Sequence, residues 1–226
     1  MAAAVTGRVG YLRHTGWVQQ TTPPKTTPAP DSTGIPSQTG QWFASRDGGR
    51  WWFDSGSVAL DFAYTGAMGD NPAWERLHEA SDLGEWLQPR FPGVDGEATD
   101  GDLRDATMLR TALAAAATSA SRSETIEPRV VDVINLFAAT PDVPPSLAGG
   151  TRQAGRTRAR VSQLLSAIAR EAVELFDEGH AARIRECAAD DCALVFYDES
   201  RSNNRRWCSM QRCGNRAKVR AHRARA

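Results

Sequence analysis

The chain has 226 residues and equal numbers of basic and acidic side chains, 27 of each, so its formal net charge is zero. This balance excludes a chain that is basic throughout, such as a ribosomal extension, and a highly charged disordered protein. Hydrophobic residues make up 41%, which is enough for one sizeable core or two small ones. No apolar run reaches the roughly 18 residues of a membrane span, and no secretory h-region is visible. We therefore expect a cytoplasmic protein.

The charges are unevenly distributed along the chain. Residues 200–226 hold nine basic side chains and no acidic one, whereas residues 1–199 hold 18 basic and 27 acidic side chains. The first part is therefore nine charges negative, and the last 27 residues are nine charges positive. Such segregation indicates an anionic partner for the basic end.

The first half of the chain shows signals for an extension, a hairpin and two short helices. Residues 1–40 are rich in Thr, Pro, Gly and Gln and lack apolar periodicity, which predicts a disordered N-terminal extension. Aromatic residues at 42–43 and 51–53 flank an Asp-Gly turn signal and predict a β-hairpin. Residues 57–65 suit a short helix, and a second helix is expected to run from its N-cap Ser81 to Leu87.

Three longer helices are predicted next. Apolar residues recur at helical spacing over 102–120, and a further helix should run over 128–139 with Pro128 in its first turn. The longest helix is predicted over 151–178, where Gly179 would end it. We therefore expect a mainly α-helical domain with a small N-terminal β-hairpin over residues 41–180.

All four cysteines fall within the last 40 residues, at Cys187, Cys192, Cys208 and Cys213. Two C-x4-C pairs separated by fifteen residues suit a tetrahedral metal site, in which each pair supplies two thiolates. The alternatives are two disulfides, which a reducing cytoplasm disfavours, or buried free thiols. Because four thiolates leave no open position on the metal, the pattern predicts one structural Zn²⁺ ion and not a catalytic one.

A small four-cysteine zinc finger, made of a short β-hairpin and a helix, is expected over residues 181–226. Residues 193–197 suit a strand, residues 205–207 would return toward the second cysteine pair, and a helix should follow from Ser209. On that helix one face is basic, and an adjacent row of small residues is expected to lie against the hairpin. The basic face comprises Arg212, Arg216, Arg220 and Arg223, and the small row Cys213, Ala217, Ala221 and Ala224. An Arg row without local acids predicts phosphate opposite it.

These residues resemble a known family. The run 206–218, which contains Cys-Gly-Asn-Arg at 213–216, is similar to the signature of the CGNR zinc fingers, and Arg185-x-Cys187 and Phe196-x-Asp198-x-Ser200 also fit. The resemblance implies that the four cysteines are zinc ligands in a DNA-binding bacterial transcription regulator. The motifs at 53–65 and 83–87 resemble the opening of the ABATE domain, a stress-induced transcription regulator domain. This chain has Tyr64 where that family tends to have Asn.

The resulting hypothesis is a DNA-binding transcription regulator whose finger contacts DNA. The candidate contacts are Arg201, Arg205, Arg206, Arg212, Arg216, Lys218, Arg220 and Arg223, with Trp207 and Asn215 as supporting residues of the zinc site. Acidic pairs at 190–191 and 198–199 are expected in solvated loops or as Arg partners.

Two alternatives remain open at this point. The finger could dock on the acidic body, since residues 41–110 hold 13 acidic and six basic side chains, or on a protein partner. It could also be a thiol-based redox sensor. No nucleophile elbow, P-loop or dinucleotide motif is present, so we expect no enzymatic activity.

Overall fold

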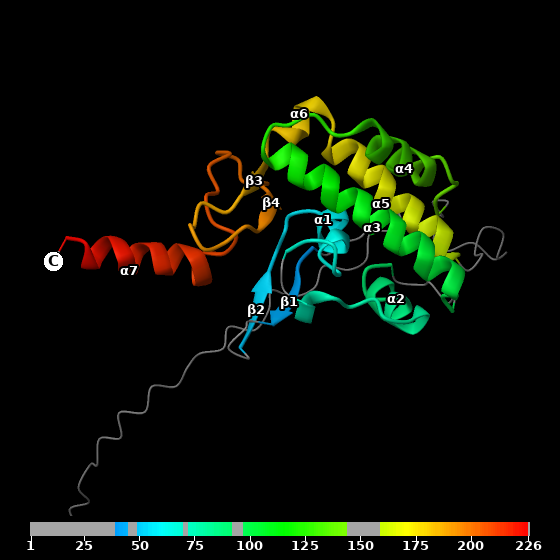
Figure 1. The fold of residues 1–226 in the computed structure, drawn as a ribbon, viewed down its shortest axis with the longest axis horizontal. Helices are drawn as coiled ribbons and strands as arrows, with labels where there is room; N and C mark the ends of the chain where they lie inside the picture. The colour runs from blue at the N-terminus through cyan, green and yellow to red at the C-terminus, as the bar shows by residue number, and fades with distance from the viewer. Residues whose placement is uncertain (1–38, 45–48, 70–71, 92–96, 144–158, 226) are drawn as a thin grey trace, which may run out of the picture.

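The computed structural model describes residues 39–44, 49–69, 72–91, 97–143 and 159–225. The predicted extension over 1–40 lies almost wholly outside these residues, as do the predicted start of the longest helix at 151 and the turn at 45–48. The described part is mainly helical, with two small antiparallel hairpins, as the sequence predicts (Figure 1). None of its helices combines the length and hydrophobicity that a membrane crossing requires.

The first hairpin consists of β1 (Gln41–Ala44) and β2 (Arg50–Phe53), paired with Gln41 opposite Phe53. Its two faces differ because side chains alternate along a strand. Phe43 and Phe53 are buried in the core, whereas Trp42 and Trp52 are exposed on the other face. The predicted hairpin is therefore present, with one face available to solvent.

Helix α1 (Val58–Ala63) follows the hairpin and is buried along its whole length. Ser57 is its N-cap, and the Ser57 hydroxyl accepts a hydrogen bond from the Leu60 amide at 3.3 Å. A second cap comes from far along the chain, because the Glu171 carboxylate accepts from the amides of Val58 (3.0 Å) and Ala59 (2.7 Å). The carboxylate thus neutralises the positive end of a buried helix.

The body continues with a 3-10 turn (Pro72–Trp74) and helices α2 (Ala80–Leu87), α3 (Asp100–Ser121), α4 (Pro128–Ala138) and α5 (Val161–Leu175). The predicted cap Ser81 is wrong. Glu79 is the N-cap of α2, since the Asp82 carboxylate accepts from the Glu79 amide at 3.0 Å. The predicted stop at Gly179 is also wrong, because α5 ends at Leu175 and Gly179 lies inside the short helix α6 (Glu178–Ala181).

Helices α3, α4 and α5 pack against one another, and α1 lies against α3 and α5 (Figure 1). Leu109 and Leu113 of α3 and Leu164 and Ile168 of α5 are fully buried at the centre. Burial of one such side chain stabilises the fold by about 1.5–3 kcal/mol. The apolar periodicity of these helices therefore identifies the main core.

The second hairpin consists of β3 (Ile184–Glu186) and β4 (Val195–Tyr197). The strand predicted at 193–197 is present as β4, but its partner is β3 and not the expected return at 205–207, which is not a strand. Instead, the Arg206 carbonyl accepts a hydrogen bond from the Ala188 amide at 2.8 Å.

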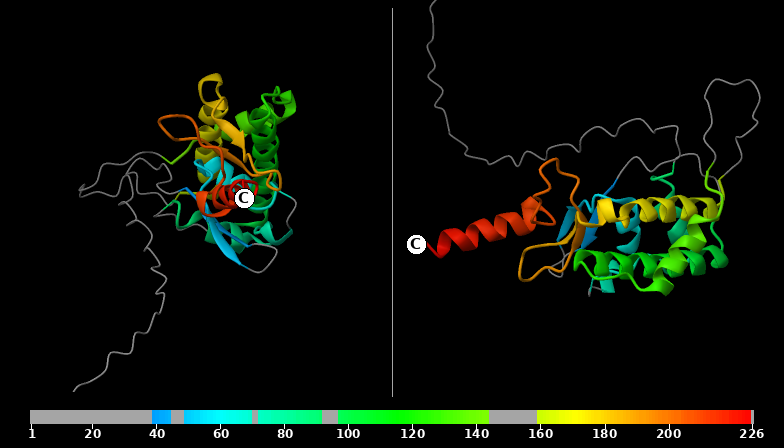
Figure 2. Two further views of the ribbon diagram at one scale, coloured as in Figure 1. Left: turned by 90° about the vertical axis from the view of Figure 1, so that its left-hand side faces the viewer. Right: turned by 90° about the horizontal axis from the view of Figure 1, so that it is seen from above.

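A π-helical turn (Met210–Gly214) then leads into α7 (Asn215–Arg223). Figure 1 and the right-hand view of Figure 2 show α7 pointing away from the helical body. The expectation that Ala221 and Ala224 lie against the hairpin is wrong, because both residues are exposed.

Candidate metal centre

The hairpin that carries the first cysteine pair belongs to the main hydrophobic core. Ile184, Val195 and Phe196 are buried together with the side chains of the helical body, and α3 packs against β3. The outer edge of β4 is closed by the body rather than by another strand. The Tyr64 hydroxyl donates to the Val195 carbonyl (3.0 Å) and accepts from the Val195 amide (2.7 Å). Two residues on, the Tyr197 amide donates to the Ser55 carbonyl at 2.7 Å.

Gly56 lies where the body meets the second hairpin, at a position that disfavours any other residue. Gly56 has a φ of 79°, which disfavours other residues, and a Cβ there would lie 2.6 Å from the Tyr197 carbonyl oxygen. The contact between body and hairpin therefore requires glycine at position 56. Together with Tyr64 it fixes the hairpin on the body.

The four cysteine sulfurs converge at one point beside this hairpin. All four Sγ atoms lie within 4.8 Å of one another, and none is in a disulfide. The Cys208 sulfur is 3.7 Å from that of Cys192 and 3.5 Å from that of Cys213. A tetrahedral site with Zn–S bonds of about 2.3 Å requires sulfur separations of about 3.8 Å. The cluster therefore fits one structural zinc ion, held by Cys187, Cys192, Cys208 and Cys213.

Hydrogen bonds from its neighbours favour negative charge on the Cys187 sulfur. The pKa of the Cys187 thiol is lowered because Cys192 and then Cys208 donate hydrogen bonds to its sulfur, and the Cys208 amide donates to it as well at 3.4 Å. Cys192 and Cys208 show raised pKa values because they serve as those donors. Arg216 Nη2 lies 3.1 Å from the Cys213 sulfur. A zinc tetrathiolate carries a formal charge of −2, so this guanidinium offsets part of it.

Asp198 and Arg205 hold the two halves of the finger together. Asp198 is fully buried, and its carboxylate accepts from the Ser200 amide (2.9 Å) and the Arg205 amide (2.8 Å), so it is not in a solvated loop. The Arg205 guanidinium donates to the carbonyls of Asp54 and Cys208, both at 2.7 Å, and lies 4.2 Å from the centre of the Phe196 ring. Arg205 therefore joins the body, β4 and the second cysteine pair.

Helix α7 has a carboxylate partner on one side only among the described residues. Asp191 accepts from Arg216 at 2.9 Å and from Arg220 at 3.2 Å, and Asp190 lies 4.0 Å from Arg220. Both acids belong to the loop between Cys187 and Cys192. The loop of the first cysteine pair thus anchors one row of the helix that follows the second pair.

The basic residues predicted to bind nucleic acid fall into two groups in the structure: those with contacts inside the protein, and those that are exposed without a described carboxylate partner. Arg205 is used internally, Arg212 stacks 4.4 Å from the Trp51 ring centre, and Arg216 and Arg220 pair with Asp191. Four are exposed without a carboxylate partner in the described part of the chain: Arg201, Arg206, Lys218 and Arg223.

Of the two supporting residues, Trp207 is half-buried beneath Arg206, with 5.2 Å between the guanidinium and the ring centre. Asn215 is exposed at the start of α7. Sequence reasoning misses Tyr64 and assigns Arg205 to nucleic acid, because the partners of these two residues lie 131 and 151 residues away.

Two protein-family models match the chain. The CGNR zinc finger model matches residues 183–226, which contain all four cysteines and α7. The ABATE model, described as "Putative stress-induced transcription regulator", matches residues 56–179, more than half of the chain. No curated protein matches it. The chain therefore belongs to the ABATE family and carries a CGNR zinc finger over residues 183–226.

Proposed function

We propose that this protein is a DNA-binding transcription regulator in which α7 enters the major groove of the duplex. The observation that carries the proposal is the position of α7, which points away from the body and has no buried residue (Figure 2). Its first turns are anchored by the zinc centre, and the rest is free to meet a partner. An α-helix is narrow enough to fit the major groove, and a basic one neutralises phosphates on both sides.

The rows of α7 suit different contacts. Lys218 and Arg223 are exposed, and no carboxylate in the described ranges pairs with them, so we assign them to phosphates. Arg216 and Arg220 are shared between Asp191 and any phosphate that approaches. We therefore expect Lys218 and Arg223 to account for most of the salt dependence of DNA binding. Arg216 and Arg220 should contribute a smaller part.

Asn215 and Val219 lie one turn apart on α7, in the row next to Arg216 and Arg220. Val219 is an apolar side chain that is 49% exposed among mostly charged neighbours. Asn215 is exposed at the start of the helix. An Asn amide can bind adenine in a bidentate manner, and an apolar side chain can contact the thymine methyl group. We therefore assign base reading to these two residues, with a preference for an A·T pair.

The test is binding of the zinc-loaded full chain to duplex DNA at several salt concentrations. Six phosphate contacts predict a log–log slope near about −5, and Lys218→Ala or Arg223→Ala should each reduce it by about 1. Arg104→Ala is the matched control, since Arg104 is an exposed Arg on α3 of the body. Absence of duplex binding, or a salt slope that Lys218→Ala changes no more than Arg104→Ala does, would refute the proposal.

Docking of the basic face on the acidic body, the alternative raised by the sequence, is not supported by this arrangement. The carboxylates that meet Arg216 and Arg220 belong to the finger itself, and α7 extends away from α3, α4 and α5 (Figure 1). An intermolecular protein partner would have to compete with DNA for the same exposed helix.

A further inference from the structure

A small crevice lies in the body between the first hairpin, the end of α1 and the turn at Pro72–Trp74. It encloses about 180 Å³, and its chemically distinctive lining residues are Trp42, Phe43, Arg50, Tyr64, Trp74 and Arg76. No cysteine lines it, so it is separate from the metal centre. Pockets for drug-sized ligands usually enclose about 300–1,000 Å³, so this one suits a ligand with a single small ring.

The two arginines of the crevice repel each other. Burial lowers the pKa of Arg76, and the charge of Arg50 lowers it further, whereas no carboxylate among the described residues offsets either effect. The one hydrogen bond that Arg76 makes through its side chain within the described ranges goes to a neutral group, Gln41 Oε1, at 2.8 Å. Two cations that line the same crevice are stabilised when an anion lies between them.

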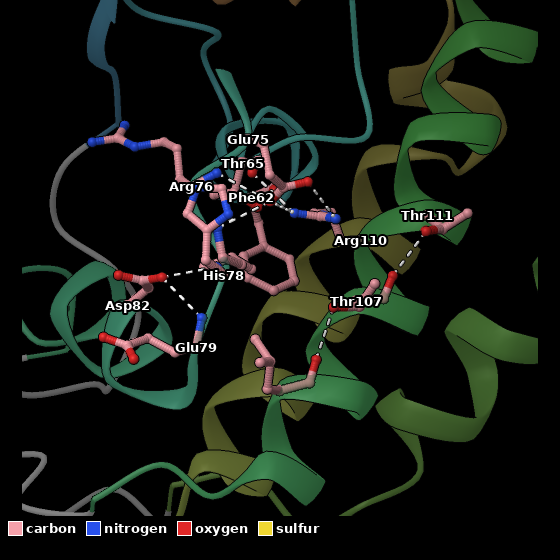
Figure 3. A network of polar contacts seen from close by, with 12 residues as sticks. Phe62, Thr65, Glu75, Arg76, His78, Glu79, Asp82, Thr107, Arg110 and Thr111 are labelled. Carbon is pink, nitrogen blue, oxygen red and sulfur yellow. Dashed lines mark hydrogen bonds and ion pairs between the residues drawn. The ribbon is translucent and has the colours of Figure 1, made fainter. Parts of the chain in front are cut away.

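The neighbouring Arg110 is a buried guanidinium that has hydrogen-bond partners within the body. Arg110 binds the Glu75 carboxylate through two nitrogens, at 2.7 and 3.1 Å, and the Thr65 carbonyl at 2.9 Å (Figure 3). The same groups fix the backbone of Arg76, whose amide donates to the Thr65 carbonyl at 2.9 Å. The backbone of Arg76 is therefore fixed beside the crevice, and the neighbouring carboxylate is committed to Arg110.

The remaining walls are aromatic. The Phe43 ring meets the Trp74 ring edge to face, with 4.7 Å between ring centres, and meets the Tyr64 ring in the same way at 5.6 Å. Trp42 is 52% exposed at the mouth of the crevice. Flat apolar walls of this kind favour the binding of another ring, which they can contact at its edge or its face.

We propose that this crevice binds a small aromatic carboxylate, with the ring against the aromatic walls and the carboxylate between Arg50 and Arg76. Two guanidinium groups can share one carboxylate through charge-assisted hydrogen bonds. The crevice also shares a side chain with the finger, because Tyr64 lines it and its hydroxyl holds both backbone groups of Val195. A bound ligand is therefore linked to the position of β4. This link to regulation rests on the proposed DNA-binding function, whereas the binding site itself does not.

The experiment measures binding of benzoate to the zinc-loaded full chain by ligand-observed NMR and calorimetry. Benzamide is the neutral analogue of the same shape, and acetate carries the charge without the ring. We expect saturable benzoate binding with a Kd near about 1 mM or tighter, and at least about tenfold weaker binding of both analogues. Equal binding of benzoate and benzamide, or no saturation with benzoate at about 10 mM, would overturn the proposal.

Two variants test the arginines separately. Arg50→Gln and Arg76→Gln each remove one of the two exposed cations of the crevice. Each should weaken benzoate binding about tenfold, because each removes one charge-assisted hydrogen bond, whereas the matched control Arg104→Gln should not. Unchanged affinity in Arg50→Gln and Arg76→Gln, with thermal unfolding as in the wild type, would also overturn it.

A final comparison separates the site from its regulatory link. A change in DNA affinity on addition of benzoate, absent in Arg50→Gln, would establish the link to the finger. Unchanged DNA affinity with intact benzoate binding would refute the link and leave the binding site. Since benzoate binding is measured without DNA, failure of the proposed function and failure of the crevice are distinguishable.

Discussion

Replacing Tyr64 with Phe removes a single hydroxyl that serves both backbone groups of Val195. Tyr64 and Val195 are 1% and 2% exposed, so water cannot take the place of the hydroxyl. Burial raises the pKa of Tyr64, which keeps the hydroxyl protonated and able to donate. Each buried backbone group left without a partner costs about 1–3 kcal/mol. Allowing for some relaxation of β4, the free energy of unfolding should fall by about 2–4 kcal/mol.

The assay is urea and thermal unfolding of the zinc-loaded full chain. For a chain of this size, the expected loss corresponds to a fall in Tm of about 4–16 °C. Tyr197→Phe is the matched control, because Tyr197 lies on the same strand and its hydroxyl makes no hydrogen bond within the described ranges. The control should stay within about 0.5 kcal/mol of the wild type. If Tyr64→Phe is no less stable than Tyr197→Phe, the hydroxyl does not hold β4 and the reasoning is wrong.

Three further predictions concern a buried carboxylate, the metal and the helix anchor. Burial raises the pKa of Asp61 to about 7, so the folded state keeps a proton that the unfolded state loses. The contribution of Asp61 to the free energy of unfolding should therefore fall by up to about 4 kcal/mol between about pH 4 and pH 7. Urea melts of Asp61→Asn should lack this component, and an identical pH profile in wild type and variant would contradict it. Cys208→Ser, or a strong chelator, should abolish zinc binding and increase proteolytic cleavage between residues 187 and 214. Retention of one zinc ion per chain by Cys208→Ser would show that this sulfur is not a ligand. Asp191→Asn should free Arg216 and Arg220, raise non-specific DNA affinity and steepen the salt slope by up to about 2. Fluorescence anisotropy against Asp105→Asn, which removes an exposed carboxylate on α3 of the body, tests this, and equal affinities would count against an anchoring role.

The parts of the fold that the sequence predicts are those with a local cause. The four cysteines indicate a metal site because each C-x4-C pair can supply two thiolates from one turn of the chain. Helix α4 begins at Pro128 as expected, because a proline without an amide hydrogen is suited to the first turn. The first hairpin is visible because its aromatic runs flank an Asp-Gly turn signal.

The parts that the sequence hides depend on partners far along the chain. Strand β3 has only three residues, two of them charged, and becomes a strand because it packs on α3 and pairs with β4. Counting charges assigns Arg205 to DNA, yet its guanidinium binds carbonyl groups inside the molecule. Asp61 is buried because it accepts from the amide of Gly40 and the hydroxyl of Ser55, which no local pattern reveals.

The way β3 and β4 share the core of the body limits how this protein can be recombined with its relatives. A chimera joined at residue 180, where the sequence alone suggests a boundary, would separate β4 from Tyr64 and Ser55 and leave the strand edge open. An open edge of this kind invites pairing with another chain, so such a chimera should aggregate. A finger exchanged between relatives would have to bring with it the segment 53–65 that closes its strand. In engineering terms the transferable unit is therefore discontinuous in sequence, although the zinc ligands themselves all lie within residues 187–213.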